Sequence, residues 1–121
     1  MKKQVVIIDY DLGNLFSVKQ ACDFIGLNSI ISSDTIKIKN ADALILPGVG
    51  SFNQGIKNLK EKNIFEIILK SYNNHVPIFG ICLGMQMLFT SSDEFELTKG
   101  LNLIKGKIIK FKKSHDMKIP H

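Results

Sequence analysis

The sequence contains no arginine, although its formal net charge at pH 7 is +5. All of its basic residues are therefore lysines, and many of them lie late in the chain. These late lysines are Lys99, Lys105, Lys107, Lys110, Lys112, Lys113 and Lys118. Arginine binds phosphates and base edges in a bidentate manner that lysine does not reproduce, so its absence disfavours a nucleic-acid-binding function. The interleaving of lysine with apolar residues over 107–111 instead predicts a strand with one solvated face.

Cysteines and long apolar runs are also scarce. Cys22 and Cys82 are the only cysteines in 121 residues, which is no disulfide framework and suits a reducing cytosol. The N-terminal apolar run covers only residues 5–8 before Asp9 interrupts it, too short for a signal-peptide core or for a membrane span. The hydrophobic content of 45% is sufficient for a globular core, and we expect a single domain over residues 1–121.

The sequence does contain an alternation of short apolar runs and helical patterns. Strands are predicted at residues 4–9, 28–32, 43–46 and 76–79. Helical segments are predicted at residues 15–25, 52–59, 64–69 and 85–89, with at most a single turn in 33–39. The alternation predicts an α/β fold with a mainly parallel sheet and helices on both faces.

The expected ends of the helices carry their own signals. Asn14 is a predicted N-cap and Gly26 a predicted C-terminal cap of the first helix. The apolar face of this helix comprises Leu15, Val18, Cys22 and Ile25, so Cys22 is predicted to be core packing. Ser51 and Gln54 have the spacing of a capping box for a later helix.

The last third of the chain has a different pattern. Residues 92–96 are predicted to be an acidic surface stretch, and short strands are expected from residue 101 onward. Gly106 marks a turn or a β-bulge in these strands. The chain stops at residues 119–121, directly after this strand-rich part, which suggests an interruption and not a natural end.

Three glycine-containing loops follow predicted strands, at residues 9–14, 47–51 and 80–84. In open parallel sheets, ligands bind outside the carboxyl ends of the strands. We therefore expect these loops to converge at one edge of the sheet and to form a site there.

The third of these loops has the pattern G-x-C-x-G, a cysteine version of the nucleophile elbow. Gly80 and Gly84 allow a strand and a helix to approach closely, and Cys82 is expected in a strained conformation at the helix N-terminus. Backbone N–H groups there favour a thiolate and can bind an oxyanion. The alternative is an inert cysteine buried in the core, which is common for this residue type.

Three motifs in this order resemble one enzyme family. They are IDYDLGNLFSV at residues 8–18, LPGVGSF at 46–52 and GICLGMQMLF at 80–89. Together they resemble the glutaminase subunits of imidazole glycerol phosphate synthase, which are class I (triad) glutamine amidotransferases. The final KIPH at 118–121 resembles the start of a further family segment, whereas Asp11 stands where the family often has glycine.

The resemblance implies a flavodoxin-like class I amidotransferase fold whose C-terminal part is missing. It also implies a cytoplasmic heterodimer in which glutamine is hydrolysed to glutamate and ammonia without a metal or other cofactor. The ammonia would pass to a (β/α)₈-barrel synthase subunit, which makes imidazole glycerol phosphate and an aminoimidazole carboxamide nucleotide in histidine biosynthesis. No nucleic acid and no membrane is implied as a partner.

The resemblance also implies roles for particular residues. Cys82 would be the nucleophile that forms a glutamyl thioester, and the Leu83 backbone N–H one oxyanion donor. A second donor would come from Val49 or Gly50 after a peptide reorients when the partner site is occupied. Gly48 and Gln86 would bind the glutamine substrate. Considered without the family, residues 47–50 are a plain turn and Gln86 an exposed helix residue.

No histidine is assigned as the base that a cysteine amidase requires. His75 precedes the strand that leads to Cys82 and should lie at the opposite end of the sheet. His115 is expected in a solvated loop, and His121 is the last residue; the His-x-Glu pair of the family would lie beyond it. We therefore expect little or no glutaminase activity from this chain alone.

Three other functions remain open at this level. A paralogous subunit could feed ammonia to a different synthase, such as one that amidates a surface sugar. A truncated, inactive chain could act only by binding a partner. A small α/β cysteine hydrolase is disfavoured by Gln86 and by the loop at residues 47–50.

Overall fold

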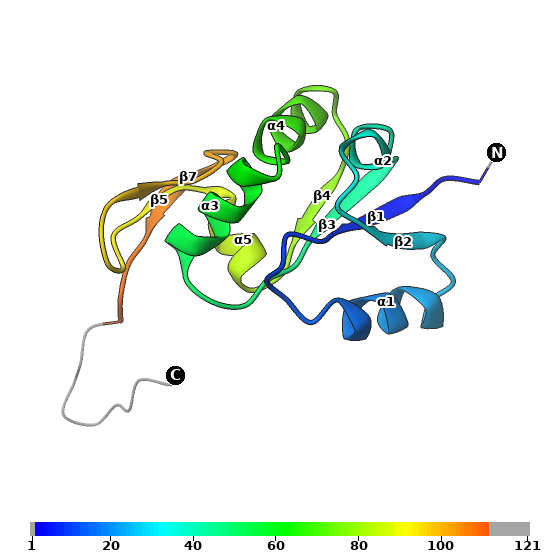
Figure 1. The fold of residues 1–121 in the computed structure, drawn as a ribbon, viewed down its shortest axis with the longest axis horizontal. Helices are drawn as coiled ribbons and strands as arrows, with labels where there is room; N and C mark the ends of the chain where they lie inside the picture. Colours follow the sequence, from blue (N-terminus) through cyan, green and yellow to red (C-terminus); the bar gives the residue numbers. More distant parts are fainter. Residues whose placement is uncertain (1, 112–121) are drawn as a thin grey trace.

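The structure is a computed structural model that describes residues 2–111, and its centre is a four-stranded parallel sheet (Figure 1). The strands are β1 (Val5–Ile8), β2 (Ser29–Ser32), β3 (Ala43–Leu46) and β4 (Ile78–Gly80), in the order β2-β1-β3-β4. Every neighbouring pair is parallel. The prediction of an α/β fold built on a parallel sheet is confirmed.

Helices cover both faces of this sheet. Figure 1 shows α1 (Leu15–Phe24) below the strands, α2 (Thr35–Lys39) and α4 (Phe65–Asn73) above them, and α3 (Phe52–Glu61) to their left. Successive strand residues point to opposite faces, so β1 and β3 each contribute to two cores. Ile7 and Ile45 pack with Cys22 of α1, which is only 4% exposed, as predicted for a core cysteine.

The larger core lies on the other face. It includes Val6 and Ile8 from β1, Leu44 and Leu46 from β3, and side chains of the helices above. The buried hydrophobic residues that α2, α3 and α4 contribute to it are Ile38, Phe52, Ile56, Leu59 and Ile68. Within the part of the chain that the structure describes, no helix is both long and apolar enough to cross a lipid bilayer.

The predicted caps of α1 are present, but one residue of its predicted apolar face is not in the core. The Asn14 side chain accepts a hydrogen bond from the Ser17 N–H at 3.3 Å, and Gly26 has a φ of +82° where α1 ends. Because α1 ends at Phe24, Ile25 leaves the helical face and is 68% exposed, so its predicted place in the core is wrong.

The capping box at α3 is only half formed. The Ser51 Oγ accepts a hydrogen bond from the Gln54 N–H at 3.4 Å. The Gln54 side chain does not reach back; it donates instead to the Asn58 Oδ1 at 2.7 Å along the same helix.

A second, three-stranded sheet follows the short helix α5 (Leu83–Met87). Its strands are β5 (Phe89–Ser92), β6 (Thr98–Lys99) and β7 (Ile104–Ile108), in the order β6-β5-β7. The pair β5–β6 is antiparallel and the pair β5–β7 parallel. Between two paired positions, β7 has one more residue than β5, and Gly106 lies in this interval with a φ of +146°. The predicted bulge at Gly106 is confirmed.

Three expectations for this region are corrected. Phe89 begins β5 and does not continue the preceding helix, which ends at Met87. Ser92 is buried at 1% exposure, because it belongs to β5 and not to the acidic surface stretch that follows. The strand expected over 107–111 extends only to Ile108, and Ile109 and Phe111 are exposed.

The strand β4 lies at the margin of the parallel sheet. Among the residues that the structure describes, it pairs only with β3. Its central residue, Phe79, is 64% exposed. The strand that leads directly to Cys82 is thus one of the two edge strands of this sheet as described, and β2 is the other.

Candidate active site

Cys82 lies between the end of β4 at Gly80 and the start of α5 at Leu83. Its backbone has φ +54° and ψ −119°, a conformation that residues with a side chain rarely adopt. Such strain persists only where the surrounding structure enforces it, and it is common at active sites. The side chain is exposed. The alternative of an inert, buried cysteine is therefore wrong for Cys82.

The two glycines of this turn are required by packing. A Cβ atom on Gly80 would lie 2.6 Å from the Cα of Met85, and one on Gly84 would overlap the carbonyl oxygen of Leu46. Both obstacles are backbone atoms, which cannot move aside as a flexible side chain does. The close approach of strand and helix that G-x-C-x-G predicted is confirmed.

The bend of residues 47–50 lies directly beside this turn. The Leu83 N–H donates to the Gly48 carbonyl at 3.2 Å, and the Ile81 N–H donates to the Leu46 carbonyl at 2.9 Å. Val49 in this bend is 58% exposed, and Gly50 has a φ of +116°. The bend thus contacts the first residue after Cys82.

The first loop, residues 9–14, contacts the 47–50 bend beside Cys82. A Cβ on Gly13 would lie 3.3 Å from the Cα of Gly48. The Tyr10 hydroxyl donates to the Pro47 carbonyl at 2.5 Å. The predicted convergence of the three glycine-containing loops at the carboxyl edge of the sheet is confirmed.

The backbone around Cys82 is already hydrogen-bonded within the protein. The Leu83 N–H, which was expected to bind an oxyanion, is occupied by the Gly48 carbonyl. The Gln86 N–H, one turn further on, donates to the Cys82 carbonyl at 3.1 Å, and the Gln86 residue is half-buried. In this conformation the Leu83 N–H becomes available only if the Gly48 carbonyl turns away.

Tyr10 also belongs to this site, although the sequence predicts for it only a turn position within the motif of residues 8–18. It is 0% exposed, although it lies in a loop, and its backbone carbonyl accepts a hydrogen bond from the Asn58 Nδ2 at 2.9 Å. Burial raises the pKa of the Tyr10 hydroxyl above its ordinary value, since the phenolate is poorly solvated there. The hydroxyl therefore keeps its proton and remains a donor to Pro47.

This raised pKa predicts a loss of stability in alkali. A tyrosine in the unfolded chain ionises with its ordinary pKa of about 10, whereas folded Tyr10 stays protonated there. The contribution of protonated Tyr10 to the free energy of unfolding is therefore complete below about pH 10. It is lost as the pH rises further, by about 1.4 kcal/mol per pH unit. Tyr10→Phe should remove this part of the slope in urea unfolding measured from about pH 8 to about pH 11. Equal slopes for the two proteins would contradict the prediction.

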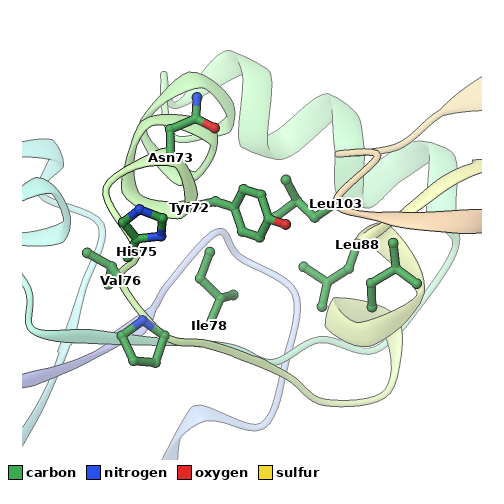
Figure 2. Close-up of a pocket in the computed structure, with 9 residues that line it drawn as sticks. Tyr72, Asn73, His75, Val76, Ile78, Leu88 and Leu103 are labelled. Carbon is green, nitrogen blue, oxygen red and sulfur yellow. The ribbon is translucent and has the colours of Figure 1, made fainter.

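His75 lies away from this site, as expected. It occupies the connection from α4 to β4, before the first residue of β4, whereas Cys82 follows the last. With Tyr72, Ile78, Leu88 and other residues it lines a mainly apolar groove of about 470 Å³. Figure 2 shows the His75 and Tyr72 rings along this groove. None of the groove residues belongs to the three glycine-containing loops. His115 and His121 lie outside the described residues.

Comparisons with known proteins agree with this geometry. A family model described as glutamine amidotransferase class-I matches residues 6–120. The chain is 49% identical over 119 residues to imidazole glycerol phosphate synthase subunit HisH of Lactococcus lactis, covering 98% of this chain and 58% of that protein. A second HisH subunit, from Sulfurimonas denitrificans, is 46% identical over 120 residues, covering 97% of this chain and 58% of that protein. The chain therefore spans under two thirds of the length of these relatives.

A solved structure supports the same fold. A crystal structure described as a glutamine amidotransferase aligns with a TM-score of 0.73 at 20% identity, covering 86% of this chain and 55% of that one. The likeness at this identity concerns the fold alone. Together with the family match over nearly the whole sequence, it leads to one conclusion: the chain belongs to the class I glutamine amidotransferase family.

Proposed function

We propose that the chain acts in glutamine hydrolysis, as the part of an imidazole glycerol phosphate synthase glutaminase subunit that carries the nucleophile. The Cys82 sulfur attacks the carboxamide carbon of glutamine, and the C–N bond breaks as the nitrogen gains a proton and leaves as ammonia. Water then hydrolyses the thioester and releases glutamate and the free thiol. The observation that carries this proposal is the exposed, strained Cys82 beside a second glycine-rich bend. The names of the relatives, both HisH subunits, favour this role over the paralogous one.

In this proposal the oxyanion donors become available through rotation of the peptide that joins Gly48 to Val49. Rotation turns the Gly48 carbonyl away from the Leu83 N–H and brings the Val49 N–H towards the sulfur; Gly50 allows the chain to accommodate this. The change breaks one backbone hydrogen bond, whose net contribution is about 1 kcal/mol. Binding of a substrate or partner can supply this amount, whereas loss of one oxyanion donor costs about a hundredfold or more in rate.

The base of the proposed reaction comes from outside residues 2–111. A cysteine amidase needs a histidine that an acid orients. Of the residues described, only His75 is a histidine, and it precedes β4 while Cys82 follows it. We propose that a His-x-Glu pair of the complete subunit fills this role. Gly48 and Gln86 are proposed to hold the substrate glutamine.

The proposed partner is a (β/α)₈-barrel synthase subunit, bound in a cytoplasmic heterodimer. It would consume the ammonia while it makes imidazole glycerol phosphate and an aminoimidazole carboxamide nucleotide. The glutaminase half is common to a paralogue that serves another synthase, so the synthase that co-purifies with the complete subunit distinguishes the two. An inactive chain that only binds a partner would lack an activated thiolate, which chemical labelling can detect.

A chloroketone analogue of glutamine tests the proposed nucleophile. We expect one equivalent to label Cys82, with thioether formation and loss of chloride, and an excess of glutamine to slow the reaction. Buried Cys22 is the internal control and should stay unlabelled in the folded chain, as measured by peptide mass spectrometry. Labelling that glutamine does not slow, or that is no faster than with a chloroketone lacking the amino-acid part, would refute glutamine recognition.

The isolated chain is nevertheless expected to turn over little or no glutamine, because the described residues offer no base near the sulfur. Glutamate release by the wild-type chain and by Cys82→Ala should be equally low. Turnover by the wild-type chain that depends on Cys82 would show that the base lies within these 121 residues, and it would contradict this part of the proposal.

A further inference from the structure

The proposed chemistry gives no role to the Tyr10 hydroxyl, although this group lies one residue from the proposed oxyanion peptide. Its bond to the Pro47 carbonyl joins residues 37 positions apart in sequence, and both residues are buried. A Cβ on Gly48 would overlap the same hydroxyl, so the Gly48 Cα packs directly against the phenol. The phenol therefore contacts the first two residues of the 47–50 bend.

Two successive carbonyls of this bend are held by different partners. The Pro47 carbonyl accepts from Tyr10, and the Gly48 carbonyl accepts from the Leu83 N–H. Rotation of the peptide after Gly48 breaks only the second bond. The first bond can persist in both orientations, because it involves the preceding peptide.

Tyr10 is itself fixed by α3. The Asn58 Nδ2 donates to the Tyr10 carbonyl at 2.9 Å, and Asn58 is in turn held by the Gln54 Nε2 at 2.7 Å. The neighbouring Asp11 pairs with Lys62 at 3.2 Å, just after the end of α3. The loop that carries Tyr10 is thus attached to α3 at two points.

The same helix also holds the far end of the bend. Ser51, which follows the bend, is the N-cap of α3. The bend is therefore held at Pro47 by Tyr10 and at Ser51 by the helix, and both attachments belong to one rigid element. Between these two attachments, Gly48 contacts the phenol and is hydrogen-bonded through its carbonyl to the Leu83 N–H, which is the bond that the proposed rotation breaks.

We propose that Tyr10 is a positioning residue for the glutaminase reaction: its hydroxyl fixes the Pro47 carbonyl, so that backbone rotation is confined to residues 48–50 and the oxyanion donors reach one defined geometry. This inference rests on the proposed function. The hydroxyl is a suitable anchor because its buried position keeps it protonated, and hence a donor, over the neutral range.

Amide hydrogen exchange on the full 121-residue chain tests the anchor without any need for catalysis. Tyr10→Phe keeps the ring and removes the hydroxyl, and it should speed exchange of the Leu83 amide by about tenfold, the equivalent of one hydrogen bond. Ile64→Val is the matched control, because Ile64 is fully buried in the same core and takes no part in the hydrogen bonds of the bend.

The two variants should differ in which amides respond. The control should accelerate exchange uniformly at amides that open through global unfolding, whereas Tyr10→Phe should accelerate Leu83 beyond its effect on the central strands. If Tyr10→Phe accelerates exchange of the Leu83 amide no more than exchange of the amides in the central strands, Tyr10 is only a packing residue and the inference fails.

Rates of Cys82 labelling test whether the Tyr10–Pro47 hydrogen bond affects oxyanion binding. The chloroketone analogue of glutamine places a carbonyl in the oxyanion site, whereas iodoacetamide alkylates the thiolate without one. Tyr10→Phe should lower the ratio of the two rate constants by about tenfold, with the iodoacetamide rate unchanged. An unchanged ratio, or a ratio that rises because the Leu83 N–H is freed from Gly48, would overturn the positioning role. Failure of the wild-type chain to prefer the glutamine analogue would refute the proposed function instead, whatever the exchange data show.

Discussion

A Cys82→Gly variant is expected to be more stable than the wild-type chain and inert towards glutamine analogues. The backbone of Cys82, with φ +54° and ψ −119°, carries strain of about 1–3 kcal/mol for a residue with a Cβ. Glycine adopts this conformation without the steric cost, although it loses more entropy on folding, about 0.5–1 kcal/mol. We therefore expect the free energy of unfolding to rise by about 1 kcal/mol, as measured from urea unfolding curves.

Cys82→Ala separates the strain from the chemistry. Alanine removes the sulfur but keeps the Cβ, so this variant should be equally inert and no more stable than the wild-type chain. Because the Cys82 side chain is exposed, few packing contacts are lost in either variant. A glycine variant that is less stable than the alanine variant would mean that the turn holds no strain at this position.

Gly84→Ala is expected to have the largest effect on stability. The added Cβ would overlap the Leu46 carbonyl oxygen, which belongs to β3 in the centre of the sheet. Relief requires α5 to move away from the sheet, and this also moves Cys82. The expected loss is about 3 kcal/mol or more, a large share of the total stability of a small domain, and urea unfolding measures it.

Gly26→Ala provides the control for this substitution. Gly26 sits at positive φ, +82°, but an added Cβ would meet no atom within 4 Å. Gly26→Ala should lower the free energy of unfolding only through the unfavourable backbone conformation, by about 1–2 kcal/mol. If Gly84→Ala costs no more than Gly26→Ala, the close approach of α5 to β3 does not exist in solution.

The parallel sheet could be predicted because its signals are local. Each strand is a short run of apolar residues that a turn residue ends, as in Ala43–Leu46 before Pro47. The errors occur where local pattern and tertiary packing disagree. Phe89 continues a helical pattern, yet it pairs with Ile104 of β7, which no local signal could reveal.

The candidate site could be predicted in part for the same reason. The spacing of Gly80, Cys82 and Gly84 is itself a local signal of a strained turn, and the structure has that turn. The bond from Tyr10 to Pro47 is different, because it exists only once β1 and β3 lie side by side. A buried tyrosine in a loop has no periodicity, so its role becomes visible only after the loops are placed. The roles of the site residues in catalysis stay predictions.

The position of β4 has a mechanical consequence. Among the described residues it pairs only with β3, so its other edge is open, and the thiol follows only two residues after the end of the strand. A polypeptide that pairs with the open edge of β4 would displace Cys82 through the short backbone between them. The displacement would not have to be transmitted through the hydrophobic core. Binding of such a polypeptide and the reactivity of Cys82 would then be coupled through a displacement of β4, the shortest strand of this sheet.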